Sequence, residues 1–404
     1  MTDTDILIAG GGQVGLALAV ALRQAAPSLA VTLVDAVPPD VATREGRAST
    51  IVAGGRKMLE RLGVWDAIAP QAQPVSEMIV TDSRTGDVAR PVFLTFATEG
   101  TAHVVADGVV VAALRKSASD AGVAIIAPET VTDFVADGTV VRATLKATAI
   151  GARLLVAADG VRSKLRDIAG IATVGRQYGQ TGIVATVMHE RPHEGRAEEH
   201  FLPAGPFAML PLIDDADGRH RSSLVWTEPP DVAERLVKGD PLVFQVELER
   251  RFGHRLGAIR VAGKPLAFPL GVTLAREFVR PRFALVGDAA HSIHPIAGQG
   301  LNLGYRDVAA LAETLVEGHR LGLDVGSLTV LGRYQRWRRY DTAEMALATD
   351  ALNTLFANDN PALRIMRDVG LGIVDRLPGL KRLFIGEASG DTEGAPRLLR
   401  GEAI

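Results

Sequence analysis

The chain of 404 residues is long enough for two domains that each bury a core. Its formal net charge of -3 offers no electrostatic footprint for nucleic acid, and it contains no cysteine, which excludes disulfides, thiolate catalysis and cysteine-ligated metals. No apolar run approaches the roughly 20 residues that span a bilayer, and the acidic N-terminus lacks the regions of a signal peptide. We therefore expect a cytoplasmic protein without a metal site.

The N-terminal segment predicts a strand, a glycine-rich turn, a helix and a second strand. An apolar run at 5–9 is followed by Gly10-Gly11-Gly12-Gln13-Val14-Gly15, a helical pattern at 16–24, and a second apolar run that closes with Asp35. This is the dinucleotide-binding fingerprint: the glycines admit a pyrophosphate, the helix N-terminus attracts its charge, and the acid accepts hydrogen bonds from a ribose. NAD and FAD both use this arrangement.

The next segment is polar and is expected to loop over this site. The loop covers 44–49, and Ser49 or Thr50 is expected to cap a helix that reaches Leu62. Arg47 is the candidate to face the cofactor phosphates, with a solvated loop arginine as the alternative.

Alternating and apolar patterns predict further strands and one helix. The strands are expected at 78–81, 92–94, 123–126, 140–145 and 152–157, and the helix at 109–121. The last of these strands ends at Asp159-Gly160, with Arg162 beyond, and this turn opens either a ligand site or an ordinary capped helix. Residues 176–275 show little helical periodicity and predict a mostly antiparallel sheet inserted into the α/β domain, as one wall of a pocket.

A second strand-turn-helix unit lies at 282–311. The apolar run 282–286 predicts a strand that stops at Gly287-Asp288, followed by a turn closed by Pro295 and Gly298 and a helix opened by Gly300. Strand ends of this kind bind ligands in open α/β sheets, and bare helix amides attract negative charge. The layout suits a cofactor with hydroxyls at one end and a charge-accepting ring at the other; a plain glycine-rich turn is the alternative.

The remaining residues, 308–385, are mostly helical in pattern, and Pro361 is expected to begin a helix. This helix has an apolar stripe with basic flanks that would suit an anionic lipid surface, whereas packing on its own domain is the alternative. The stripe consists of Leu363, Met366, Val369, Ile373 and Leu377, and the basic residues are Arg364, Arg367, Arg376, Lys381 and Arg382.

Three motifs stand in one order, and together they resemble those of the flavin-dependent aromatic hydroxylases of the p-hydroxybenzoate hydroxylase type. They are Gly10-x-Gly12-x-x-Gly15, Asp159-Gly160 and Gly287-Asp288. Within that superfamily, the stretches 287–304, 355–364 and 376–382 are similar to the ubiquinone-biosynthesis hydroxylases of bacteria and mitochondria. The resemblance covers essentially the whole chain and is thinnest in the inserted sheet.

The resemblance implies FAD as the bound cofactor and NAD(P)H as a transient electron donor. The glycines of the first motif would receive the FAD pyrophosphate, Asp35 the adenosine ribose and Asp288 the ribityl chain. Backbone amides from Gly298 to Asn302 would meet the pyrimidine edge of the flavin. The expected cofactor contacts are Gly10, Gly12, Gln13, Val14, Gly15, Asp35, Arg47, Asp159, Arg162, Gly287, Asp288, Pro295, Gly298, Gln299, Gly300, Leu301 and Asn302.

On the substrate side, the resemblance implies that Gly205, Pro206 and Phe207 form a turn that faces the flavin. One departure concerns the start of the helix near Val109, where the family often carries an arginine and this chain has Asp107-Gly108. Four residues are candidates for a catalytic base by type alone, and none is assigned because each also suits a structural role. They are His193, His200, Tyr178 and Tyr305.

The fold expected from these observations is α/β, with a Rossmann-like FAD-binding domain interleaved with a mostly antiparallel substrate domain and a helical C-terminus. The FAD-binding domain is predicted at 1–74, 106–175 and 276–345, the substrate domain at 75–105 and 176–275, and the C-terminal helical region at 346–404.

The resemblance implies hydroxylation of the aromatic ring of a polyprenylated phenol in ubiquinone biosynthesis, with NAD(P)H and O2 as co-substrates and a flavin C4a-hydroperoxide as the oxidant. Because the prenyl tail is insoluble, we expect a peripheral contact with the inner membrane or a quinone-synthesis complex. Alternatives are a flavin hydroxylase of a small aromatic compound, a prenyl-chain reductase, and a non-catalytic FAD-binding member of such a complex. A halogenase is disfavoured, because its Trp-x-Trp-x-Ile-Pro motif is absent.

Overall fold

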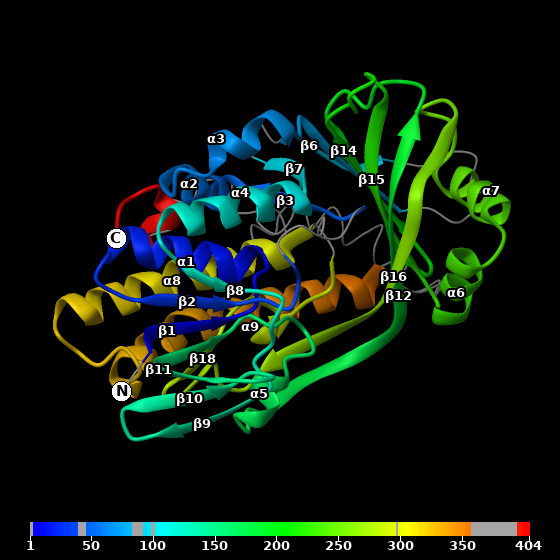
Figure 1. Ribbon diagram of the computed structural model, residues 1–404. Helices are drawn as coiled ribbons and strands as arrows, with labels where there is room; N and C mark the ends of the chain where they lie inside the picture. Colours follow the sequence, from blue (N-terminus) through cyan, green and yellow to red (C-terminus); the bar gives the residue numbers. More distant parts are fainter. Residues whose placement is uncertain (1–2, 39–45, 83–91, 98–101, 296–297, 357–393) are drawn as a thin grey trace.

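A computed structural model describes residues 3–38, 46–82, 92–97, 102–295, 298–356 and 394–404. Figure 1 shows an α/β domain on the left and a tall sheet on the right, with the long helix α9 (Leu328–Phe356) running from one towards the other. The expected fold class is confirmed, and the chain passes between the two parts several times.

The sheet of the α/β domain has five parallel strands in an order that reverses at its centre. The order is β8 (Ala124–Ile126), β2 (Val31–Val34), β1 (Thr4–Ala9), β11 (Ala149–Ala157) and β18 (Phe283–Leu285). Antiparallel strands extend it, namely β9 (Asp133–Asp137), β10 (Val140–Thr144) and β17 (Val279–Arg280). Since parallel strands share one carboxyl edge, the turns after β1, β11 and β18 meet there.

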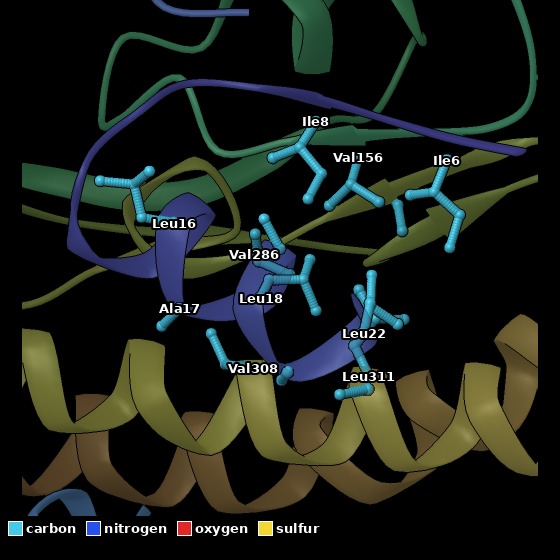
Figure 2. Packing of buried hydrophobic residues seen from close by; sticks show 14 of the residues in the cluster. Ile6, Ile8, Leu16, Ala17, Leu18, Leu22, Val156, Val286, Val308 and Leu311 are labelled. Carbon is cyan, nitrogen blue, oxygen red and sulfur yellow. The ribbon is translucent and has the colours of Figure 1, made fainter. Parts of the chain in front are cut away.

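Helices cover this sheet and bury its apolar side chains. α1 (Gln13–Ala25) lies between the sheet and α8 (Gln299–Arg320), while α4 (Asp107–Asp120) packs along α1 and α9 along α8. Figure 2 shows Leu18 and Leu22 of α1 between the strands and the α8 residues Val308 and Leu311. All four of these side chains have no exposed surface, so this packing fixes how the two glycine motifs face each other.

Residues 48–52 form a strand, so the expected loop there is wrong beyond residue 47. β3 (Ala48–Val52) pairs with β7 (Ala102–Ala106), which also pairs with β4 (Gln73–Pro74). Ser49 and Thr50 lie inside this strand, and the residue preceding helix α2 (Ala53–Arg61) is Val52. The β-branched run Thr50-Ile51-Val52 favours a strand and outweighs the capping potential of the hydroxyls. The short helices α3 (Trp65–Ile68) and η1 (Ala69–Gln71) follow.

The inserted domain is a mostly antiparallel sheet, as expected, and among its described strands only β13 and β5 pair in parallel. Its order is β19 (His291–Ser292), β16 (Ile259–Ala275), β12 (Thr173–His189), β15 (His220–Glu228), β14 (Gly205–Leu212), β13 (Arg196–Leu202), β5 (Glu77–Asp82) and β6 (Val92–Ala97). β19 belongs to the second glycine motif, so this pairing joins the motif directly to the substrate domain.

The sequence analysis did not predict two helices that lie on the outer face of this sheet (Figure 1). They are α6 (Pro230–Lys238) and α7 (Pro241–Phe252). Each begins with proline, and Asp240 caps α7 by accepting a hydrogen bond from the Leu242 amide at 2.8 Å. Prolines at first helical positions and an aspartate cap were the available signals.

The end of the chain returns to the α/β domain. η4 (Arg397–Arg400) packs on α2, where Leu399 lies beside Gly54. Residues 357–393 lie outside the described part of the chain, so the helix expected at Pro361 and its amphipathic stripe are not among the residues that the structure describes.

Candidate active site

The first glycine turn packs directly on the end of β11. Gly10 has φ +121°, and a Cβ there would lie 2.2 Å from the carbonyl oxygen of Ala158. A Cβ on Gly15 would lie 2.0 Å from the carbonyl oxygen of Gly10. The two glycines are therefore required by the close approach of the turn, helix α1 and the turn that precedes Asp159.

Gly12 differs from its neighbours because its missing side chain leaves space. No heavy atom of the residues that the structure describes lies within 4 Å of a Cβ built on it, and among these residues no side chain caps the amides of α1, which it precedes. Amides at a helix N-terminus that face open space suit a phosphate group. The turn with Gln13 thus fits the pyrophosphate of FAD.

Val14 joins the two glycine motifs. Its methyl groups would lie 3.2 Å from a Cβ on Gly287 and 2.6 Å from a Cβ on Gly304. Any side chain at Gly304 would push α8 away from α1, so the dinucleotide turn and the second motif assemble as one unit.

Asp35 lies at the end of β2, and it is buried beside the first motif. Its Oδ2 accepts a hydrogen bond from the Arg115 guanidinium at 2.5 Å, and a Cβ on Gly11 would come within 2.3 Å of the same oxygen. Gly11 is therefore required by Asp35, and Arg115 holds the carboxylate beside the first glycine turn, where the sequence predicts a contact with a ribose. Arg115 was not identified from the sequence, because 80 residues separate it from Asp35.

A buried ionic cluster centred on Asp307 fixes the turn η2 (Gly287–Ala289). Asp307 accepts hydrogen bonds from the Gly287 amide at 2.8 Å, from His291 Nε2 at 2.6 Å and from Arg338 Nε at 2.8 Å. Asp288 stands exposed on this turn, at the carboxyl end of β18. The cluster thus fixes the backbone from which Asp288 would reach the ribityl chain.

The start of α8 is fixed to β3 by one side chain. Asn302 donates from Nδ2 to the Thr50 carbonyl at 2.9 Å and accepts at Oδ1 from the Val52 amide at 3.2 Å. Gly298 precedes the helix with φ +63°, and its amide donates to the Pro295 carbonyl at 3.0 Å. Gln299 is buried, while Gly300 and Leu301 are partly exposed, so this end of α8 can present amides to a flat ring.

The turn after β11 places its two predicted residues at the surface. Asp159 and Arg162 are both exposed, the former accepting a 3.4 Å hydrogen bond from the Leu165 amide in helix α5 (Lys164–Ile168). The buried Arg166 makes the connection to the second motif, because it donates to the Ala289 carbonyl at 3.1 Å. Sequence analysis missed Arg166, since nothing in the local pattern distinguishes it from Arg162.

Arg47 reaches from the α/β domain to the substrate sheet. Its Nε lies 3.6 Å from Asp107 Oδ2, and its guanidinium lies 5.6 Å from the centre of the Phe268 ring on β16. Ser49 also donates to Asp107, at 2.6 Å. Asp107, which stands where the family often carries an arginine, therefore anchors Arg47 close to the contact between the α/β domain and the substrate sheet.

The Gly205-Pro206 turn opens β14, and Gly205 has φ +133°. A Cβ on Gly205 would lie 2.8 Å from Gln180 Nε2, which donates to the Ala204 carbonyl at 2.7 Å. Phe207 points away from this turn, with its ring fully buried at 5.7 Å from that of Trp226. Gly205 and Pro206 are buried as well, so none of the three residues predicted on the substrate side is exposed in this structure, and the Phe207 ring belongs to the core of the inserted domain.

The four residues named as base candidates all have hydrogen-bond partners. His193 Nε2 bonds to the Leu212 carbonyl at 2.8 Å, and Tyr305 donates to Gln13 at 3.1 Å. His200 bonds to Thr81 at 2.5 Å, and Tyr178 donates to Asp350 at 2.9 Å. These bonds suit structural roles for all four.

Asp288→Ala is expected to lose FAD while keeping the fold. The side chain is exposed on its turn, so its removal leaves the core intact. Loss of a charge-assisted hydrogen bond costs on the order of 1.5–3 kcal/mol, or more than tenfold in affinity. Titration of the apoprotein with FAD measures this change, and an unaltered affinity would mean that Asp288 does not contact the cofactor.

Comparison with known proteins agrees with this geometry. A family model described as FAD binding domain matches residues 3–338. Ubiquinone hydroxylase UbiL of Rhodospirillum rubrum is 42% identical, over 98% of this chain and 92% of its own length. The 3-demethoxyubiquinol 3-hydroxylase of Escherichia coli is 35% identical, over 96% of this chain and 98% of its own.

Among solved structures, p-nitrophenol 4-monooxygenase PnpA from Pseudomonas putida has the same fold, with a TM-score of 0.77, 20% identity and 99% coverage of both chains. The glycine turns, the uncapped start of α1 and the anchored Asp35 fit FAD, and the family model extends over both domains. The chain therefore belongs to the FAD-dependent aromatic monooxygenases, in the family that contains the ubiquinone-biosynthesis hydroxylases.

Proposed function

We propose that this protein hydroxylates the aromatic ring of a polyprenylated phenol intermediate of ubiquinone biosynthesis, using NAD(P)H and O2. The observation that carries the proposal is similarity to ubiquinone hydroxylases along almost the whole chain, including the substrate domain. The chemistry that FAD supplies when bound is the transfer of electrons from NAD(P)H to O2 and of one oxygen atom to the ring. The second oxygen atom leaves as water.

The residues of this chain would bind and orient the cofactor. Gly12 and the first amides of α1 would hold the pyrophosphate, Asp35 the adenosine ribose, and Asp288 the ribityl chain. The amides at the start of α8 would stabilise negative charge on the ring, because a helix N-terminus carries a partial positive charge. Asp159 and Arg162 stand exposed at the same edge of the sheet, where a visiting NAD(P)H could reach them.

The substrate sheet would supply the wall that excludes water from the reacting ring. Two contacts support a closed interface here: Arg47 lies on Phe268 of β16, and β19 of the second motif pairs with the same strand. We propose that the backbone of Gly205 and Pro206, at the start of β14, faces the flavin from the substrate domain.

A polyprenyl tail also requires a route from the bilayer. Among the described residues, no helix is both long and apolar enough to cross a membrane. We propose a peripheral contact with the membrane, or delivery by a quinone-synthesis complex, since a prenyl chain partitions into lipid.

The function is tested with the purified, FAD-loaded protein. Addition of a prenylated phenol is expected to stimulate NAD(P)H oxidation and O2 uptake, and to yield a product heavier by one oxygen atom. A strain that lacks the protein should accumulate a prenylated phenol. Normal ubiquinone in that strain, with no other hydroxylase compensating, would show that the assigned substrate is wrong.

A further inference from the structure

His294 is a buried polar side chain without a bonding partner. Its exposed fraction is 0%, and neither ring nitrogen forms a hydrogen bond with any residue that the structure describes. Burial lowers the pKa of His294 to about 4, and the opposing charge of Asp350 does not reverse this. The ring is therefore neutral near pH 7, with one donor and one acceptor unsatisfied, an arrangement that is costly unless something fills it.

The neighbours of His294 hold the ring without bonding to it. The Tyr178 ring lies edge-on at 5.3 Å, and its hydroxyl donates to Asp350 Oδ1 instead. Arg176 donates to the same oxygen at 3.0 Å. Tyr178 and Asp350 are thus engaged with each other, and the polar edge of the imidazole is left for another group.

A second unsatisfied group lies on the same helix face as Asp350. Asn353 of α9 is 4% exposed, and its Oδ1 has no bonding partner among the described residues. Its Nδ2 donates to Gln180 Oε1 at 3.1 Å, and Gln180 in turn holds the Ala204 carbonyl before the Gly205 turn. Residues three apart on a helix share a face, so Asn353 lies on the same face of α9 as Asp350, which bonds to Tyr178, the neighbour of His294.

The place of His294 in the chain sets this region next to the flavin site. It immediately precedes Pro295, whose carbonyl accepts the amide of Gly298 at the start of α8. The strand before it, β19, pairs with β16 of the substrate sheet. Along the chain, His294 therefore stands between β19, which pairs with the substrate sheet, and the turn that leads to the first amides of α8.

We propose that His294 accepts a hydrogen bond from the ring hydroxyl of the aromatic substrate. The inference rests on the proposed function, in that the substrate is a phenol. A hydroxyl that donates to an acceptor raises electron density at the ring carbons ortho and para to it. These are the positions at which an electrophilic oxygen reacts, so the contact both orients and activates the ring.

The test compares two ligands on the FAD-loaded protein. The probes are a phenol with a two-isoprene chain beside its hydroxyl and the methyl ether of that phenol, which cannot donate a hydrogen bond. Binding is followed through the flavin absorption spectrum. We expect the wild-type protein to prefer the phenol by about tenfold, and His294→Leu to lose most of this preference. FAD content should not change, because no described residue bonds to the imidazole.

Two further variants distinguish a hydrogen bond between His294 and the substrate from a change in core packing. His294→Gln keeps a donor and an acceptor at shifted positions and should retain part of the preference. Thr314→Val removes another buried polar atom that has no partner in the described part of the chain, on α8 within the α/β core, and should leave the preference intact. If His294→Leu does not retain FAD, the binding preference of His294→Gln is the test instead. A preference for the phenol over its methyl ether as strong in this variant as in wild type contradicts the proposal.

The outcomes distinguish the inference from the function on which it rests. Hydroxylation of the phenol by wild type, with equal affinity for phenol and ether, would overturn the role of His294 and leave the function standing. The same conclusion would follow if His294→Leu kept the preference, because the hydroxyl would then bond elsewhere or to water alone. If the wild-type protein neither binds nor hydroxylates the phenol, the proposed function fails and this inference fails with it.

Discussion

Asp307→Ala is expected to lower the free energy of unfolding by about 3–5 kcal/mol and to abolish retention of FAD. Asp307 has no exposed surface and accepts from the Gly287 amide, His291 and Arg338. Its removal leaves the buried Arg338 with the partly exposed Asp341 as its remaining acidic partner among the described residues, and it frees the backbone of the turn that carries Asp288. Urea unfolding and FAD titration of the same preparation measure the two effects.

The control for this variant is Asp341→Asn. Asp341 also pairs with Arg338, but its side chain is 33% exposed, so the expected loss is under about 1 kcal/mol. Similar unfolding curves for the Asp307 and Asp341 variants would contradict a central role for Asp307.

The cluster around Asp307 also predicts how the stability of the folded protein changes at low pH. Burial alone would raise the pKa of Asp307, but the charges of His291 and Arg338 hold it below its ordinary value. A carboxylate with a lowered pKa stabilises the folded state above its unfolded pKa of about 4, and this stabilisation is lost as the pH falls through the folded pKa. Asp307→Ala should therefore show a weaker loss of stability on acidification than the wild-type protein.

The parts of the fold that could be predicted from sequence are those that local chemistry determines. The first strand, glycine turn and helix follow from an apolar run, a Gly-rich segment and helical spacing within about 25 residues. β3 was missed because hydroxyl residues can cap helices as well as occupy strands, and its pairing with β7 depends on residues about 50 positions away. α6 and α7 were missed because they interrupt a region in which extended patterns dominate and helical periodicity is scarce.

The site could be predicted as a set of motifs, but its supporting contacts could not. Arg115 reaches Asp35 across 80 positions, and Arg166 reaches Ala289 across 123. His294 stood within a recognised motif, yet only the structure shows that its ring is buried and unbonded among the described residues. Sequence spacing reports neither burial nor partners at such distances, so the residues that position the motif remained hidden.

Gly10→Ala is expected to impair folding and FAD binding together. The new Cβ would lie 2.2 Å from the Ala158 carbonyl oxygen, and φ of +121° is strained for any residue with a side chain. The clash is with backbone, which cannot easily shift because β1 and β11 pair through Ala9 and Ala157 directly before the turn. Low yield of folded protein, a lower unfolding midpoint and absent flavin are the expected results, and a normal midpoint would contradict this packing.

Gly12→Ala is expected to weaken FAD binding without changing the stability of the fold. Its φ of -75° suits alanine, and no heavy atom in the described part of the chain lies within 4 Å of the added Cβ, so the unfolding midpoint of the apoprotein should equal that of wild type. The same methyl group would occupy the space above the α1 amides that a pyrophosphate needs, and we expect FAD affinity to fall by at least about tenfold. Calorimetric titration with FAD and with ADP tests this directly, because both ligands carry the pyrophosphate. Unchanged affinity for both would mean that the open space at Gly12 does not receive it.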